Sequence, residues 1–223
     1  RGREAAHPPR GDVAGVVGIG VTADAWHHAA DLLAREHVQV VVVRVNSDGG
    51  LETETPKFHR VFQHDYLPRF YTVAWIDSAT GSAALSTYVI PEVYFTPTGI
   101  FGAAVGGWCP GLGVPRPDIA TMNDWMDNAS DATGRDRAIG RSMQVLEPLS
   151  ASIDLQSGEV RWFQDTTGDH LLNPPGRVFM FTSEDAVRYK FAAGIATDMV
   201  SRLENGHYTS PGLRTLVRIA EGM

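Results

Sequence analysis

The sequence predicts an α/β domain built around a largely parallel sheet. Val38–Val45 is almost entirely valine, which is typical of a parallel strand that is buried on both faces. Strand-like and helix-like segments alternate along most of the chain, as they do where helices connect parallel strands. The 223 residues, of which 43% are hydrophobic and 20% charged, suit one globular domain.

The first half of the chain supplies most of the expected sheet. Each expected strand is short and rich in β-branched or aromatic residues, and each expected helix follows a capping residue, a proline or a glycine turn. The expected strands are Val13–Val21, Val38–Val45, Phe70–Ile76 and Glu92–Phe95. The expected helices are Ala23–Glu36 after Thr22, a segment within Glu52–Phe62, and a tightly packed helix entered from a turn within Asp77–Tyr88.

The second half mixes helices with a hairpin. Ile119–Ala132 and Arg135–Met143 are expected to be helical, with Gly134 between them. Gln156-Ser157-Gly158 lies between two strand-like segments, Ser152–Leu155 and Glu159–Phe163, and indicates a β-hairpin. The remaining expected elements are a strand at Val178–Phe181, a helix start at Thr182, and short helices at Ala186–Ala193 and Asp198–Asn205.

These elements suggest one domain between two less ordered ends. We expect a flexible arm over residues 1–12, a domain over residues 13–205 with an insert at about residues 150–181, and a C-terminal tail over residues 206–223. The sequence begins Arg1-Gly2-Arg3 without methionine, from which we expect a missing N-terminal segment. Such a segment would bring membrane proximity, so the expected compartment stays open between the bacterial cytoplasm and the cell envelope.

The composition argues against several classes of function. The formal net charge of -7 and the lack of a basic block argue against nucleic-acid binding. Cys109 is the single cysteine, so the chain has no internal disulfide framework. No spacing of His, Cys and carboxylate residues suggests a metal, and we expect no cofactor.

Two segments contain the residue types of an acyl-transfer site. Asn46-Ser47-Asp48-Gly49-Gly50 ends a buried strand, where glycines let the backbone approach a substrate carbonyl and their amides can stabilise an oxyanion. Val73–Ser86 leads from a strand into a helix of small residues and contains the candidate serines Ser78, Ser82 and Ser86; backbone amides at a helix N-terminus can stabilise an anion beside such a serine. A third segment, Phe181–Ala196, has the pattern of a closing helix and turn.

The order and spacing of these segments resemble the Clp protease/crotonase superfamily, closest to the signal peptide peptidases and NfeD-type serine peptidases. The resemblance implies a spiral of ββα units with a largely parallel sheet, a small β-hairpin insert and C-terminal helices. It implies Ser82 as the nucleophile and the Gly49 and Gly50 amides as the oxyanion hole. It also implies a peptide or protein substrate or partner, and a homo-oligomer.

The general base departs from the family pattern. The branch that the chain resembles uses a lysine, but the only lysines here are Lys57 and Lys190. His59 and His64, on the helix after the glycine turn, are the candidate bases. Two alternatives therefore stand beside an active serine peptidase: an inactive pseudo-peptidase that serves as a structural or peptide-binding subunit of an assembly, and a crotonase-type acyl-CoA enzyme with Asp77 as its acid.

Overall fold

The computed structural model describes residues 12–102, 118–197 and 216–218. Its central sheet has the strand order β1-β2-β3-β4-β8, with β10 also pairing with β2 and β9 also pairing with β4. All pairings are parallel except that of β8. The strands are β1 (Asp12–Ala14), β2 (Val40–Ser47), β3 (Tyr71–Thr80), β4 (Glu92–Gly102), β8 (Met180–Thr182), β9 (Gly194–Ile195) and β10 (Leu216–Arg218). The predicted α/β class with a largely parallel sheet is confirmed.

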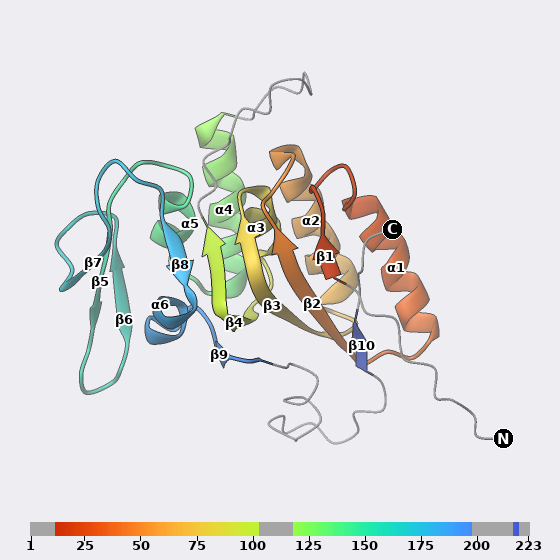
Figure 1. The fold of residues 1–223 in the computed structure, drawn as a ribbon. Coiled ribbons are helices and arrows are strands. Elements are labelled where there is room, and N and C mark those ends of the chain that lie inside the picture. Colours follow the sequence, from red (N-terminus) through yellow and green to blue (C-terminus); the bar gives the residue numbers. More distant parts are fainter. Residues whose placement is uncertain (1–11, 103–117, 198–215, 219–223) are drawn as a thin grey trace.

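Helices cover one face of this sheet, as Figure 1 shows for α1, α2 and α4. Val41, Val43 and Val45 of β2 point into the main core there, together with aromatic side chains of α1 and α2 and methionines of α4. Val40 and Val42 belong to a smaller buried cluster, because successive side chains of a strand point to opposite faces. The helical elements are α1 (Ala23–Arg35), η1 (Glu52–Glu54), α2 (Thr55–Val61), η2 (Phe62–Tyr66), α3 (Ser82–Thr87), α4 (Ile119–Thr133), α5 (Arg137–Ser142) and α6 (Ser183–Arg188).

The central strands differ in length from those predicted. β3 continues to Thr80 and β4 to Gly102, because irregularities in the ladder let each strand bend and then resume pairing. The predicted turn within Asp77–Tyr88 is therefore the end of a strand, and α3 begins only at Ser82. The predicted strand Val13–Val21 is wrong beyond Ala14, since the chain turns at Gly15–Gly20, where Gly18 has φ +86°.

A second, antiparallel sheet stands to one side of the first (Figure 1). It has the order β6-β5-β7, with β5 at Leu149–Ile153, β6 at Val160–Phe163 and β7 at His170–Asn173. The β5–β6 hairpin was predicted, whereas β7 was not, because the four residues His170–Asn173 are too few to show the alternation of a strand. Trp162 connects this sheet to the rest of the molecule through ring contacts with Phe181 and Tyr189.

Local signals fixed several boundaries. Thr22 and Thr182 accept hydrogen bonds from backbone amides at the starts of α1 and α6, as N-cap residues do. Gly134 ends α4 with φ +69°. The predicted helix Asp198–Asn205 lies outside the described residues, and three residues of the expected tail form β10. Within the described ranges, no helix is long and apolar enough to cross a bilayer.

Candidate functional site

The glycine turn after β2 lies against two other backbone segments. A Cβ atom at Gly50 would lie 2.1 Å from the carbonyl oxygen of Val17, which no side chain can tolerate. The Val17 amide donates to the Gly49 carbonyl at 3.0 Å, and the Leu51 amide donates to the Val17 carbonyl at 2.9 Å. The turn is thus fixed from both sides of Gly50.

The same turn meets the start of α3. A Cβ atom at Gly49 would lie 3.0 Å from the Thr80 carbonyl oxygen and 3.2 Å from the Ser82 amide nitrogen. Gly81, which precedes the serine, has φ +56° and ψ -135°, a conformation that favours glycine strongly. Gly49 and Gly81 therefore let the end of β2 and the start of α3 come together, and Ser82 becomes the first residue of the helix.

Ser82 is 1% exposed, and its Oγ has no hydrogen-bond partner among the described residues. A buried hydroxyl without a partner loses its hydration and gains nothing in return, so such groups are uncommon in proteins. The two competing serines are placed differently. Ser86 Oγ donates to Thr55 Oγ1 at 3.5 Å, and Ser78 pairs within the sheet opposite Asn46 and Ile100.

The two predicted oxyanion donors are not equivalent. The Gly49 amide donates to Ser47 Oγ at 3.2 Å, and Ser47 Oγ in turn donates to the Gly15 carbonyl at 2.6 Å. The Gly50 amide donates no hydrogen bond within the described part of the chain. Of the two amides, that of Gly50 is therefore the one that can donate to an oxyanion without giving up another hydrogen bond.

His59 on α2 is buried and contacts the helix of Ser82 one turn further along. Its Nε2 lies 2.7 Å from the Leu85 carbonyl oxygen. A carbonyl can only accept, so Nε2 carries the proton. Burial lowers the pKa of His59 to about 4, which keeps the imidazole neutral at pH 7. His59 is therefore hydrogen-bonded to the middle of α3, and among the described residues it forms no hydrogen bond with Ser82 Oγ.

The other basic candidates lie elsewhere. His64 is exposed within η2. Lys57 forms an ion pair with Glu54, with 2.5 Å between Nζ and Oε1, and this contact raises the pKa of Lys57. A lysine with a raised pKa is a poor general base. Glu54 itself is held by the Ala23 amide at the start of α1, at 3.1 Å.

Asp77, the acid that a crotonase-type reaction would need, is already engaged. Its Oδ2 accepts from an Arg44 amino group at 3.0 Å, and its Oδ1 accepts from Thr96 Oγ1 at 3.3 Å. The Arg44 guanidinium lies 5.3 Å from the centre of the Trp75 ring. Across the described segments, no group of three or more His, Cys, Asp or Glu residues could hold a metal ion.

The C-terminal end of α3 contains a feature that the sequence did not reveal. Arg135, just after α4, donates from its terminal amino groups to the carbonyls of Tyr88, Ile90 and Pro91. The Phe191 ring lies 4.6 Å from the guanidinium carbon. Gly81 was missed as well, although a glycine directly before a candidate serine at a strand–helix junction is a usable signal.

No protein-family model and no curated protein matches the sequence. Several solved structures match the fold. The 1510-N membrane-bound stomatin-specific protease, in a serine-to-alanine mutant, has a TM-score of 0.62 at 10% identity, covering 94% of this chain and 96% of that one. Its lysine-to-alanine mutant in complex with a substrate peptide has a TM-score of 0.58 at 11% identity, covering 92% and 87%.

A third solved structure with a similar fold is a Clp protease. ClpP1 from Listeria monocytogenes has a TM-score of 0.53 at 13% identity, covering 85% of this chain and 91% of that one. At identities this low, the matches establish the fold only. The chemistry of the site has to be inferred from the residues that this chain contains. The chain has a ClpP-like fold.

Proposed function

We propose that this chain is a serine peptidase-like protein that binds peptides and, when active, hydrolyses them with Ser82 as the nucleophile. The observation that carries the proposal is the Ser82 hydroxyl: it is buried, lacks a partner in the described part of the chain, and starts a helix against the Gly49 backbone. This hydroxyl has no competing hydrogen bond with a described residue, and a substrate must first expose it before the attack, with the Gly50 amide as the donor to the developing oxyanion.

In this proposal, Ser82 Oγ forms a bond to the peptide carbonyl carbon and the peptide C–N bond breaks, with the serine proton passing to a base and then to the leaving amine. Water later hydrolyses the ester. His59 and His64 stay the predicted bases. The low pKa of His59 makes it a weak one, so a base contributed by a second copy of the chain is the alternative that the expected homo-oligomer would supply.

A second candidate function is a pseudo-peptidase that binds peptides or holds an assembly together without cleaving bonds. The observation in its favour is that no described side chain forms a hydrogen bond with Ser82 Oγ, while Lys57 is paired with Glu54. A serine without a base is a weak nucleophile.

The test is labelling with a fluorophosphonate probe, which reacts with activated serines. We expect the wild-type chain and Ser86→Ala to be labelled and Ser82→Ala to remain unlabelled. Ser86 is the matched control because it is buried on the same helix, one turn away. Labelling of Ser82→Ala would reject Ser82 as the nucleophile, and a folded wild-type chain that is not labelled would favour the pseudo-peptidase.

A further inference from the structure

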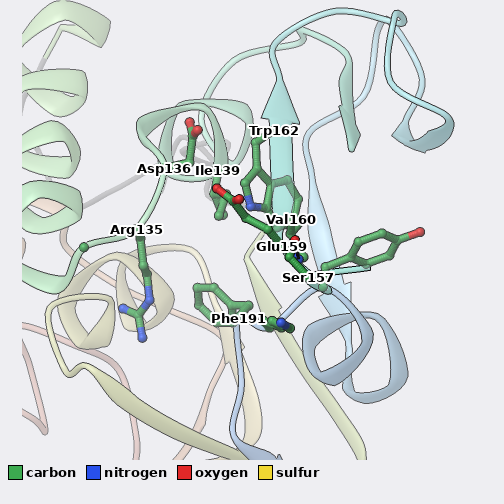
Figure 2. A pocket seen from close by; sticks show the side chains of 11 residues that line it. Arg135, Asp136, Ile139, Ser157, Glu159, Val160, Trp162 and Phe191 are labelled. Carbon is green, nitrogen blue, oxygen red and sulfur yellow. Dashed lines mark hydrogen bonds between the residues drawn. The ribbon is translucent and has the colours of Figure 1, made fainter. Parts of the chain in front are cut away.

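An open cavity of about 550 Å³ lies at the far end of α3 from Ser82. Figure 2 shows its walls, which come from the α4–α5 turn, the β5–β6 hairpin and the residues that follow α6. Ile139, Val160, Trp162 and Phe191 give it an apolar lining. A neighbouring cavity of about 570 Å³, against the start of β4, shares Lys190 and Phe191 with it.

Two cations line the first cavity without an acidic partner. Neither Arg135 nor Lys190 forms an ion pair with any described residue. Arg135 donates to backbone carbonyls only, which satisfies its N–H groups but does not neutralise its charge. An uncompensated positive charge beside a partly apolar cavity favours an anionic ligand group.

Lys190 is placed in a conformation that its residue type does not favour. It has φ +58° just after α6, the position where helices usually end in glycine. A Cβ atom at Gly158 would lie 3.3 Å from Lys190 Nζ, so the ammonium group reaches the tip of the β5–β6 hairpin. The side chain thus stands where the two cavities meet, and a local backbone cost of this kind points to a function.

The two acids of the cavity face different ways. Asp136 Oδ1 accepts from the Ala138 amide at 2.9 Å at the start of α5, and Figure 2 shows its carboxylate pointing away from the Arg135 guanidinium. Glu159 extends toward Ile139 across the cavity and forms no ion pair among the described residues (Figure 2). It is therefore free to accept a hydrogen bond from a ligand N–H.

We propose that this cavity binds the C-terminal residue of a peptide, or a free amino acid of the same chemistry. The carboxylate would pair with Lys190, the N–H beside it would donate to Glu159, and an apolar side chain would pack against Ile139, Val160 and Phe191. The neighbouring cavity offers space for the preceding residues. The inference rests on the proposed function only in assuming that the chain binds peptides, since Ser82 lies at the other end of α3.

Fluorescence polarisation tests this site in the full chain carrying Ser82→Ala, which prevents cleavage. The probe is a tetrapeptide ending in leucine, labelled at its N-terminus, with a free C-terminal carboxylate. We expect the C-terminal amide to bind at least about tenfold more weakly, because it cannot form the charge-assisted contact. Equal binding of acid and amide, or no binding of the acid up to millimolar protein, would overturn the proposal.

Two variants separate binding from folding. Lys190→Gly suits the φ of +58° and should fold normally while binding the peptide at least about tenfold more weakly. Lys57→Gln removes the other lysine, which lines neither cavity, and should bind like the parent chain. Unchanged binding by a folded Lys190→Gly variant would reject the site. Competition by free leucine as effective as that by the unlabelled peptide would identify a free amino acid, and competition by the peptide alone would identify a peptide terminus.

Discussion

The two ends of α3 differ in the way they are built. Its start is formed by Gly49, Gly81 and Ser82, with backbone packed against backbone and no ionisable side chain on the serine oxygen among the described residues. At its far end, the Arg135 guanidinium contacts the rings of Tyr88 and Phe191 and lies beside an open cavity. One six-residue helix thus joins a closed, uncharged site to an open, charged one. The close approach at the first site excludes side chains, whereas the second site depends on them.

Gly50→Ala should have the largest effect, because it attacks the backbone packing that supports the serine end. The added methyl would lie 2.1 Å from the Val17 carbonyl oxygen, so the turn must move. We expect a loss of about 4 kcal/mol or more in the free energy of unfolding, measured by urea titration. Gly134→Ala is the control: its φ is +69° but nothing lies within 4 Å, so about 1 kcal/mol is expected. Equal losses would mean that the close approach is unimportant.

Acid should weaken the attachment of α2 to the middle of α3 through His59. The pKa of His59 is lowered from 6.5 to about 4 in the folded chain, so the unfolded chain binds the proton more readily. The contribution of His59 is therefore fully present above pH 6.5 and is lost as the pH falls toward 4, by about 3 kcal/mol between pH 7 and pH 4. Urea titrations of wild type and His59→Gln across this range isolate the effect from that of the carboxylates. Parallel curves for the two proteins would contradict it.

Arg135→Gln tests the charged end of α3. The substitution leaves carbonyls of Tyr88, Ile90 and Pro91 without their donors and removes a positive charge from the C-terminal end of a helix. We expect a loss of about 2 kcal/mol in the free energy of unfolding. Arg137→Gln breaks an exposed ion pair with Asp131 and a longer one with Asp127, which keeps its pair with Arg141, so it should cost less than about 1 kcal/mol. Similar losses from both variants would show that burial of the cation contributes little.

The smallest expected effect is a gain in the free energy of unfolding. Lys190→Gly relieves the strained backbone after α6 and loses part of that benefit to the greater freedom of glycine in the unfolded chain. The net change should be a stabilisation of about 0.5 kcal/mol, seen as a small rise in the urea midpoint at unchanged m-value. A clear destabilisation would mean that the lysine side chain supports the hairpin, and would weaken its assignment to ligand binding.

The sequence determined the elements whose signals are local. The valine run of β2, the threonine caps of α1 and α6, and the glycine that ends α4 each appear where the chain pattern places them. Hydrophobic periodicity and capping involve only residues a few positions apart, so they can be seen in a sequence. The extension of β3 and β4 depends on pairing with neighbouring strands, and no local pattern encodes it.

Only the tertiary structure decided what surrounds each candidate residue. It brought Gly49 to Ser82 across more than thirty positions of sequence and committed the His59 ring to Leu85. It also placed Arg135 and Lys190, which are more than fifty positions apart in the sequence, on one cavity. The physical reason is that burial, pKa and hydrogen-bond partners depend on packing between distant segments, whereas residue type and spacing do not.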